Sequence, residues 1–258
     1  MPAGDGADIL PRHFGGHGDA RPAFFQGNAG CICCGAAGML GSVADGVGGE
    51  RRAVREELRN GAHHVKVMAG GGVASPSDPL DGTQYSIEEM TAIVEEARAA
   101  RTYVMAHAYS PESIVHAVTN GVRSIEHGNL LDRETAQLMA EREAVLVPTL
   151  VTYLAMSEHG RDMGMAEVAL RKNTEVLEAG KHAIELATAA GVLVGFGSDL
   201  MGELEVEQLR GLQAQHEVQG TLELLRSLTS RNAQILGVDH VGSIRPGANG
   251  DLVILADD

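Results

Sequence analysis

The sequence has no tryptophan and few other aromatic residues, with Phe, Trp and Tyr together making up 3% of its 258 positions. Basic residues are also scarce, because 20 Lys and Arg stand against 35 Asp and Glu, which gives a formal net charge of −15. A chain this acidic is not expected to bind nucleic acid or an anionic membrane surface. The composition therefore favours a small molecule as the binding partner.

Cysteine is limited to Cys31, Cys33 and Cys34, an odd number crowded into one segment. This pattern excludes a disulfide framework, and a structural zinc site would need a fourth ligand, so we expect reduced thiols that pack within a loop. No apolar run approaches the roughly 18 residues of a membrane span, and the first ten residues lack the basic and apolar regions of a signal peptide. These absences predict a cytoplasmic protein.

The chain does contain a regular alternation of apolar runs and amphipathic segments. The run His64–Met68 is short, rich in β-branched residues and followed by glycines, which predicts a buried strand. Ser86 stands three residues before Glu89, the spacing of a capping box, and predicts a helix that ends near Ala100.

The same alternation continues to residue 236. Apolar strands that alternate with helices predict an α/β fold with a parallel sheet and right-handed crossovers. A (β/α) barrel and a doubly wound sheet both fit this pattern. Further strands are expected at 103–107, 124–127, 145–151 and 192–196, and further helices at 110–121, 132–141, 166–190, 205–218 and 221–236.

The two ends of the chain are less regular, so we divide it into three parts. Residues 1–50 are a loop-rich N-terminal segment with a possible strand at Asp8–Leu10 and a helix that starts near Gly49. Residues 51–240 are the strand and helix core. Residues 241–258 hold a glycine-rich turn and the start of a β segment at Asp251.

Four polar residues lie at or just past the ends of expected strands: Lys66, His107, His127 and Asp199. Taken singly, each has an ordinary explanation as a buried histidine, an exposed lysine or a capping aspartate. The carboxyl ends of parallel strands converge on one face, however, and this would bring all four together. Two imidazoles, a carboxylate and a lysine at one rim predict a metal site with a base.

Five segments resemble successive strands of the amidohydrolase superfamily, specifically its prolidase-like branch of Xaa-Pro dipeptidases and N-acyl amino acid hydrolases. They are HVKVMAGGG, VMAHAYS, RSIEHGN, VPTLVTY and GFGSDL. GGHGD at residues 15–19 and the closing segment from Gly242 also resemble that branch, so the likeness runs from Gly15 to Asp258. It implies a (β/α)8 TIM-barrel fold and hydrolysis of the amide bond in dipeptides or N-acyl amino acids.

The resemblance also implies roles for the four rim residues. Lys66 would react with carbon dioxide to form a carbamate that ligates metal, and His107 and His127 would be neutral imidazole ligands. Asp199 would bind the metal and take the proton from the attacking water, while a metal-bound hydroxide attacks the amide carbonyl. The expected cofactor is a divalent metal, zinc before others, as one or two ions.

One family feature is absent, because no His-x-His occurs in the 258 residues. The resemblance therefore covers about strands three to eight of eight, without most of the small flanking β domain. The remaining ligands suffice for one ion. An incomplete barrel exposes strand edges, which favours a homo-oligomer.

Other interpretations stay open. The chain could be a catalytically incomplete fragment or an interaction module, or it could hydrolyse a lactone or a carbamate ester on the same fold. His17 and Tyr153 flank the expected rim and are candidate substrate contacts, although a loop histidine and a packed tyrosine fit equally well. Gly70–Gly72 predicts a turn over the site, and no nucleotide cofactor is implied.

Overall fold

The computed structural model describes residues 11–13, 42–75 and 78–254, and it confirms the alternation of strands and helices. Five strands form one sheet in chain order, and each neighbouring pair is parallel. A separate parallel pair, β1 (Pro11–His13) and β2 (Ser42–Ala44), lies beside the first strand of this sheet. The five strands are β3 (Val65–Met68), β4 (Val104–Ala108), β5 (Ser124–His127), β6 (Val145–Val147) and β7 (Leu193–Val194).

Three of the helices between the strands begin at residues predicted from the sequence, Ser86, Ser110 and Asp132, whose side chains cap them. The helix expected near Gly49 begins at Gly46. The Ser86 hydroxyl accepts from the Glu89 amide while the Glu89 carboxylate accepts from the Ser86 amide, which completes the capping box. The Asp132 carboxylate caps the helix that begins at Arg133, because it accepts from the Thr135 amide. The helices are α2 (Gly46–Arg59), α3 (Ile87–Ala99), α4 (Pro111–Thr119), α5 (Arg133–Glu141) and α7 (Glu167–Ala190).

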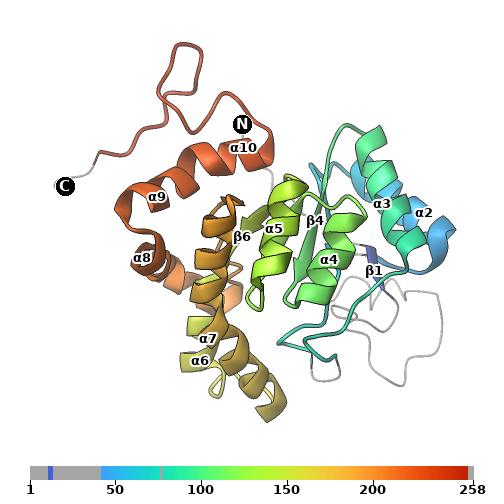
Figure 1. Cartoon of the computed structure of the whole chain (residues 1–258), viewed down its shortest axis with the longest axis horizontal. Helices are drawn as coiled ribbons and strands as arrows, with labels where there is room; N and C mark the ends of the chain where they lie inside the picture. The colour runs from blue at the N-terminus through green and yellow to red at the C-terminus, as the bar shows by residue number, and fades with distance from the viewer. Residues whose placement is uncertain (1–10, 14–41, 76–77, 255–258) are drawn as a thin grey trace.

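The two faces of the sheet differ in character. On one face, fully buried aliphatic side chains such as Val67, Ala106 and Ile125 belong to the main core beneath the helices, and α4 and α5 are seen over the sheet in Figure 1. Strand side chains alternate between faces, and the register sets Lys66 opposite Met105, which in turn is opposite Ser124. Lys66, His107, Ser124 and Glu126 therefore share the face away from this core.

Two predicted strands differ from the structure, one in its length and one in whether it forms. The strand expected at 145–151 ends at Val147, and a helix, α6 (Leu150–His159), begins three residues later. Pro148 has no amide hydrogen for the strand ladder, so the apolar run that follows it is taken up by a helix. The strand expected from Asp251 does not form, because residues 251–254 have no partner strand among the described residues, and Val253 is 88% exposed.

The last helices differ from the prediction in detail. The helix expected at 205–218 is a 3-10 helix, η1 (Gly202–Glu207), followed by α8 (Gln208–Gln219). The helix expected at 221–236 is α9 (Thr221–Arg226), a π-helical turn (Ser227–Arg231) and α10 (Asn232–Leu236). The possible strand at Asp8–Leu10 lies outside the described residues. Within the described part of the chain, no helix is long and apolar enough to cross a bilayer.

Candidate functional site

Two of the predicted site histidines are in ring contact at the carboxyl end of the sheet. His107 and His127 are each 4% exposed, and their ring centroids lie 4.6 Å apart with the planes at 69°. The register pairs His107 with Glu126, so regular alternation would turn the next residue, His127, to the opposite face. His127 instead has a left-handed φ of 76°, and this uncommon conformation accompanies the ring contact.

Hydrogen bonds fix the orientation of both rings. His107 Nε2 lies 2.9 Å from the Gly71 carbonyl oxygen. Because a carbonyl only accepts, Nε2 carries the hydrogen, and a neutral His107 has its lone pair on Nδ1. His127 Nδ1 lies 2.7 Å from Thr149 Oγ1. Such contacts through one ring nitrogen are how proteins hold imidazoles that act through the other.

The glycine run after β3 packs closely over this end of the sheet. A Cβ on Gly71 would lie 1.8 Å from the Pro79 carbonyl oxygen, so no other residue fits there without movement of the backbone. Gly70 forms an isolated bridge with Thr83, and the Gly71 amide donates to the Gly82 carbonyl at 3.3 Å. The loop thus folds back on itself as a turn, as the sequence predicts.

The other two predicted residues, Lys66 and Asp199, interact electrostatically. Asp199 is solvent-accessible and has a left-handed φ of 53°. The surrounding protein raises the pKa of its carboxyl, and the positive charge of Lys66 acts in the opposite direction. Asp199 is thereby disposed to take up a proton more readily than an ordinary aspartate.

Glu126 is a site carboxyl that the sequence analysis missed. It is 6% exposed, and burial raises its pKa to about 7, with Asp199 adding to the rise. A hydrogen bond from the Ser124 hydroxyl at 2.5 Å and the charge of Lys66 oppose this effect. The sequence could have indicated Glu126, because it lies in a predicted buried strand. Residues two apart in a strand share a face, so Glu126 shares a face with Ser124.

Tyr109 is a second missed residue, and it joins the histidines to Tyr153. Its ring centroid lies 4.7 Å from that of His107 and 5.4 Å from that of His127. The Tyr153 hydroxyl donates to the Tyr109 hydroxyl at 3.0 Å, and Tyr153 is fully buried. Burial raises the pKa of both phenols, so both are neutral at pH 7. Tyr109 follows His107 by two residues, the spacing of a shared strand face.

The described residues contain only part of a metal site. Among them, no three His, Cys, Asp or Glu side chains are grouped so that they could hold a metal ion. The donors present are the two imidazoles and the Asp199 carboxylate, beside the Lys66 amine. His17 and the three cysteines lie outside the described residues. The roles predicted for Lys66, His107, His127, Asp199 and Tyr153 stay predictions.

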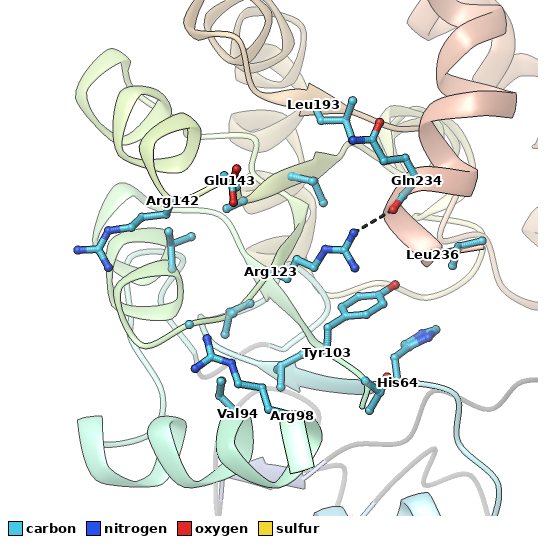
Figure 2. A pocket seen from close by; sticks show the side chains of 18 of the residues that line it. His64, Val94, Arg98, Tyr103, Arg123, Arg142, Glu143, Leu193, Gln234 and Leu236 are labelled. Atoms are coloured by element: carbon cyan, nitrogen blue, oxygen red, sulfur yellow. Dashed lines mark hydrogen bonds between the residues drawn. The ribbon is translucent and has the colours of Figure 1, made fainter. Parts of the chain in front are cut away.

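A wide cleft lies at the other end of the sheet. Its volume is about 1320 Å³, and it is lined by the first residues of three strands, Val104, Val145 and Leu193. None of the predicted site residues lines it. Figure 2 shows its labelled arginines, which are Arg98, Arg123 and Arg142.

Helix ends explain these arginines. Arg98 lies in the last turn of α3, and Arg142 is the C-cap residue of α5. Positive side chains there offset the negative end of the helix dipole. Arg123 donates to the Gln234 carbonyl at 2.9 Å, drawn as a dashed line in Figure 2, and lies 4.9 Å from the Tyr103 ring centroid. The arginines of this cleft therefore have structural explanations.

Comparisons with known proteins identify the family of the chain. Residues 21–258 match the sequence profile of the Amidohydrolase family. The chain belongs to the amidohydrolase family. It is similar to the ochratoxinase of Aspergillus niger, with 32% identity over 242 residues that cover 91% of this chain and 47% of that protein. The chain thus spans about half the length of the curated relatives it matches.

Solved structures confirm the fold. A prolidase complexed with N-methylphosphonate-L-proline has a TM-score of 0.92 and 48% identity, over 97% of this chain and 61% of that one. A Xaa-Pro dipeptidase with methionine bound in its active site has a TM-score of 0.74 and 28% identity, over 81% of this chain and 52% of that one. The chain has parallel strands that alternate with helices, and it covers about 60% of the similar prolidase chain. These two findings confirm the predicted truncated barrel.

Proposed function

We propose that this chain carries the site of a metal-dependent hydrolase that cleaves the amide bond of Xaa-Pro-like dipeptides or N-acyl amino acids. The observation that carries the proposal is the pair of buried, oriented imidazoles, His107 and His127, at the carboxyl end of the sheet. The similarity to a prolidase complexed with a proline derivative supports the substrate class.

The donor chemistry fits one divalent ion. A neutral His107 presents a lone pair on Nδ1, and His127 lies in contact with it. We assign Lys66 as its carbamate, together with His107, His127 and Asp199, to hold the ion, with zinc as the expected metal. When bound, a divalent metal lowers the pKa of its water toward about 7 and polarises a carbonyl.

The chain's own residues supply the proton transfer. The raised pKa of Asp199 lets its carboxylate take a proton from water and pass it to the leaving amine nitrogen. Glu126, with a pKa of about 7, holds its proton part of the time, which limits the negative charge around Lys66. Neutral Tyr109 and Tyr153 pack beside the histidines and exclude water from that side.

The direct test is hydrolysis of a panel of Xaa-Pro dipeptides, other dipeptides and N-acyl amino acids by the chain with zinc and bicarbonate. Asp199→Asn should lower kcat/KM by ~10²–10⁴-fold, the usual contribution of a general base. Arg142→Ala, in the cleft at the opposite end, should leave it unchanged. Equal rates for Asp199→Asn and the unchanged chain would contradict the proposal.

A second candidate is a catalytically incomplete amidohydrolase chain. Two observations favour it: the described residues hold no three-ligand group, and the chain spans 61% of the similar prolidase. The same panel, extended to lactones and carbamate esters, separates the candidates. Turnover that a chelator abolishes supports the hydrolase, and turnover confined to an ester would move the substrate class to that bond.

A further inference from the structure

Helix α7 ties down the glycine loop through one side chain, Lys172. Its ammonium nitrogen donates to the carbonyl oxygens of Gly72 at 3.2 Å, Ser75 at 2.7 Å and Asp78. An ammonium group has three hydrogens, so these three carbonyls use its whole capacity to donate. The lysine thereby joins points of one loop that lie 94 to 100 residues away along the chain.

The same loop sets the orientation of a site histidine. Gly71 precedes the first Lys172 acceptor, and its carbonyl accepts from His107 Nε2 at 2.9 Å. Gly71 is itself pressed against the Pro79 carbonyl, next to the last acceptor, Asp78. Movement of the 72–78 segment would therefore move the carbonyl that orients His107.

One further polar contact of this loop reaches outside it, between the Val73 backbone and the Tyr109 hydroxyl. Ser75 donates to Asp78 at 2.9 Å, a bond within the loop, and Gln84 donates to the Gly70 carbonyl at 3.1 Å from the strand side. In apolar contacts, Val73 and Leu80 of the loop belong to one buried cluster with Tyr109, Tyr153 and Val176 of α7. Lys172 is the charged group that fastens the outer part of the loop.

The contacts of Lys172 differ from those of an ordinary surface lysine. Lys172 is half-buried, burial lowers the pKa of its amine, and its partners are carbonyl oxygens, although the charge of Asp78 favours the ammonium. Hydrogen bonds that an ionised group makes are stronger than those between neutral groups. The next residue, Asn173, donates to the Tyr153 carbonyl at 2.9 Å, so α7 contacts two walls of the same site.

We propose that Lys172 is a positioning residue that holds loop residues 70–75 and 78–82 over the candidate site and, through the Gly71 carbonyl, holds His107 in the tautomer with its hydrogen on Nε2. This inference rests on the proposed function only for the statement that the oriented histidine serves catalysis. The hold on the loop and on the ring is a property of the folded chain by itself.

The test compares Lys172→Met with Lys181→Met, a matched change on the same helix. Lys181 is half exposed and pairs with Glu217 at 2.5 Å, away from the loop. Hydrogen–deuterium exchange of the peptide covering 69–84 should be about tenfold faster in Lys172→Met, because the loop loses the hydrogen bonds that hold it to α7. Lys181→Met should exchange at the unchanged rate.

A second readout reports the histidine directly. Nitrogen-15 shifts of His107 should show one Nε2–H tautomer in the unchanged chain and in Lys181→Met, and a mixture in Lys172→Met. Unchanged exchange and an unchanged tautomer in Lys172→Met would overturn the proposal. If Lys172→Met does not fold, Lys172→Arg, which keeps several donors, should retain the protected loop, and rapid exchange in that folded variant would overturn it equally.

Activity separates this inference from the proposed function. If the chain hydrolyses its substrate, kcat should fall about tenfold in Lys172→Met with a smaller change in KM, as expected for a misplaced group in the reacting site. If the chain hydrolyses nothing and the loop and tautomer still respond to Lys172→Met, the proposed function fails and the positioning role stands.

Discussion

The two ends of the five-stranded sheet differ in almost every physical respect. The carboxyl end holds His107 and His127 at 4% exposure, with a left-handed backbone at His127 and a raised pKa at Asp199. The amino end opens into a cleft of about 1320 Å³ lined by arginines, of which Arg98 and Arg142 are exposed. The arginines are accounted for by helix ends, whereas the two imidazoles are buried, held by hydrogen bonds and in contact with each other. Left-handed backbone and shifted pKa values, more than volume, indicate the functional end.

Gly71 provides the strongest way to test the packing at the carboxyl end. Gly71→Ala would place a Cβ 1.8 Å from the Pro79 carbonyl, so the loop must move. We expect a loss of about 2–4 kcal/mol in the free energy of unfolding, measured by denaturant titration. Gly48→Ala in α2, where nothing lies within 4 Å, should be neutral or stabilising. Equal destabilisation by both would show that the loop is not tightly packed.

Two glutamates, Glu50 in α2 and Glu96 in α3, lie away from both ends of the sheet. They test whether the surroundings of a carboxyl set its pKa, because one is buried without a partner in the described part of the chain and the other is paired with arginines. Glu50 is fully buried, its oxygens have no hydrogen-bond partner among the described residues, and burial raises its pKa from 4.5 to about 8. Its contribution to stability is full below pH 4.5 and is lost as the pH rises toward 8, at up to ~1.4 kcal/mol per pH unit. Glu50→Gln should remove that slope in unfolding free energy measured from pH 5 to 8.

Glu96 should behave in the opposite way. Arg55 and Arg51 hold its pKa down at about 2, so its contribution is present above pH 4.5 and is lost as the pH falls toward 2. Glu96→Gln should therefore lower stability at pH 7, by roughly 1–2 kcal/mol because both arginines are partly exposed, and should have little effect near pH 2. A Glu50 slope that matches that of Glu96 would contradict this account of burial.

Thr149 tests whether the anchored imidazole matters for the site. Thr149→Val removes the hydroxyl 2.7 Å from His127 Nδ1 and keeps the side-chain shape. We expect a fall of ~10–100-fold in zinc affinity or in kcat/KM, the usual effect of removing a group that orients a metal-ligating histidine. Thr174→Val on α7, where the hydroxyl donates to its own helix, is the control and should change neither.

Arg123 gives the smallest expected effect and tests the amino end. Arg123→Ala removes the bond to the Gln234 carbonyl and the contact with the Tyr103 ring. Unfolding free energy should fall by about 1 kcal/mol, with kcat/KM unchanged. A large loss of activity with unchanged stability would mean that the cleft, and not the carboxyl end, takes part in the reaction.

Much of this arrangement could be predicted from the sequence, because buried parallel strands are continuous apolar runs and their helices begin at recognisable caps. Ser86, Ser110 and Asp132 begin helices as expected. The short apolar run after Pro148 fits either a buried strand or a buried helix. For that reason α6 was not predicted. The strand from Asp251 was wrong because a strand needs a partner, which local sequence does not show.

The candidate site residues could be proposed from the ends of the predicted strands. The backbone conformation and the long-range contacts around them could not. The left-handed turn at His127 is a backbone property that no periodicity reveals. Lys172 is about 100 residues away from the loop that it holds, and such a contact leaves no local pattern. Glu126 could have been found by alternation, since it shares a strand face with Ser124.

Metal content is the most direct test of the central claim, that the carboxyl end of this sheet is the working end of the chain. The folded chain is incubated with zinc and bicarbonate, freed of loose ions and analysed by elemental mass spectrometry beside Lys66→Ala and Arg142→Ala. We predict about one ion per chain in the unchanged protein and in Arg142→Ala, and almost none in Lys66→Ala. No retained zinc in the unchanged chain, or equal zinc in Lys66→Ala, would contradict the account.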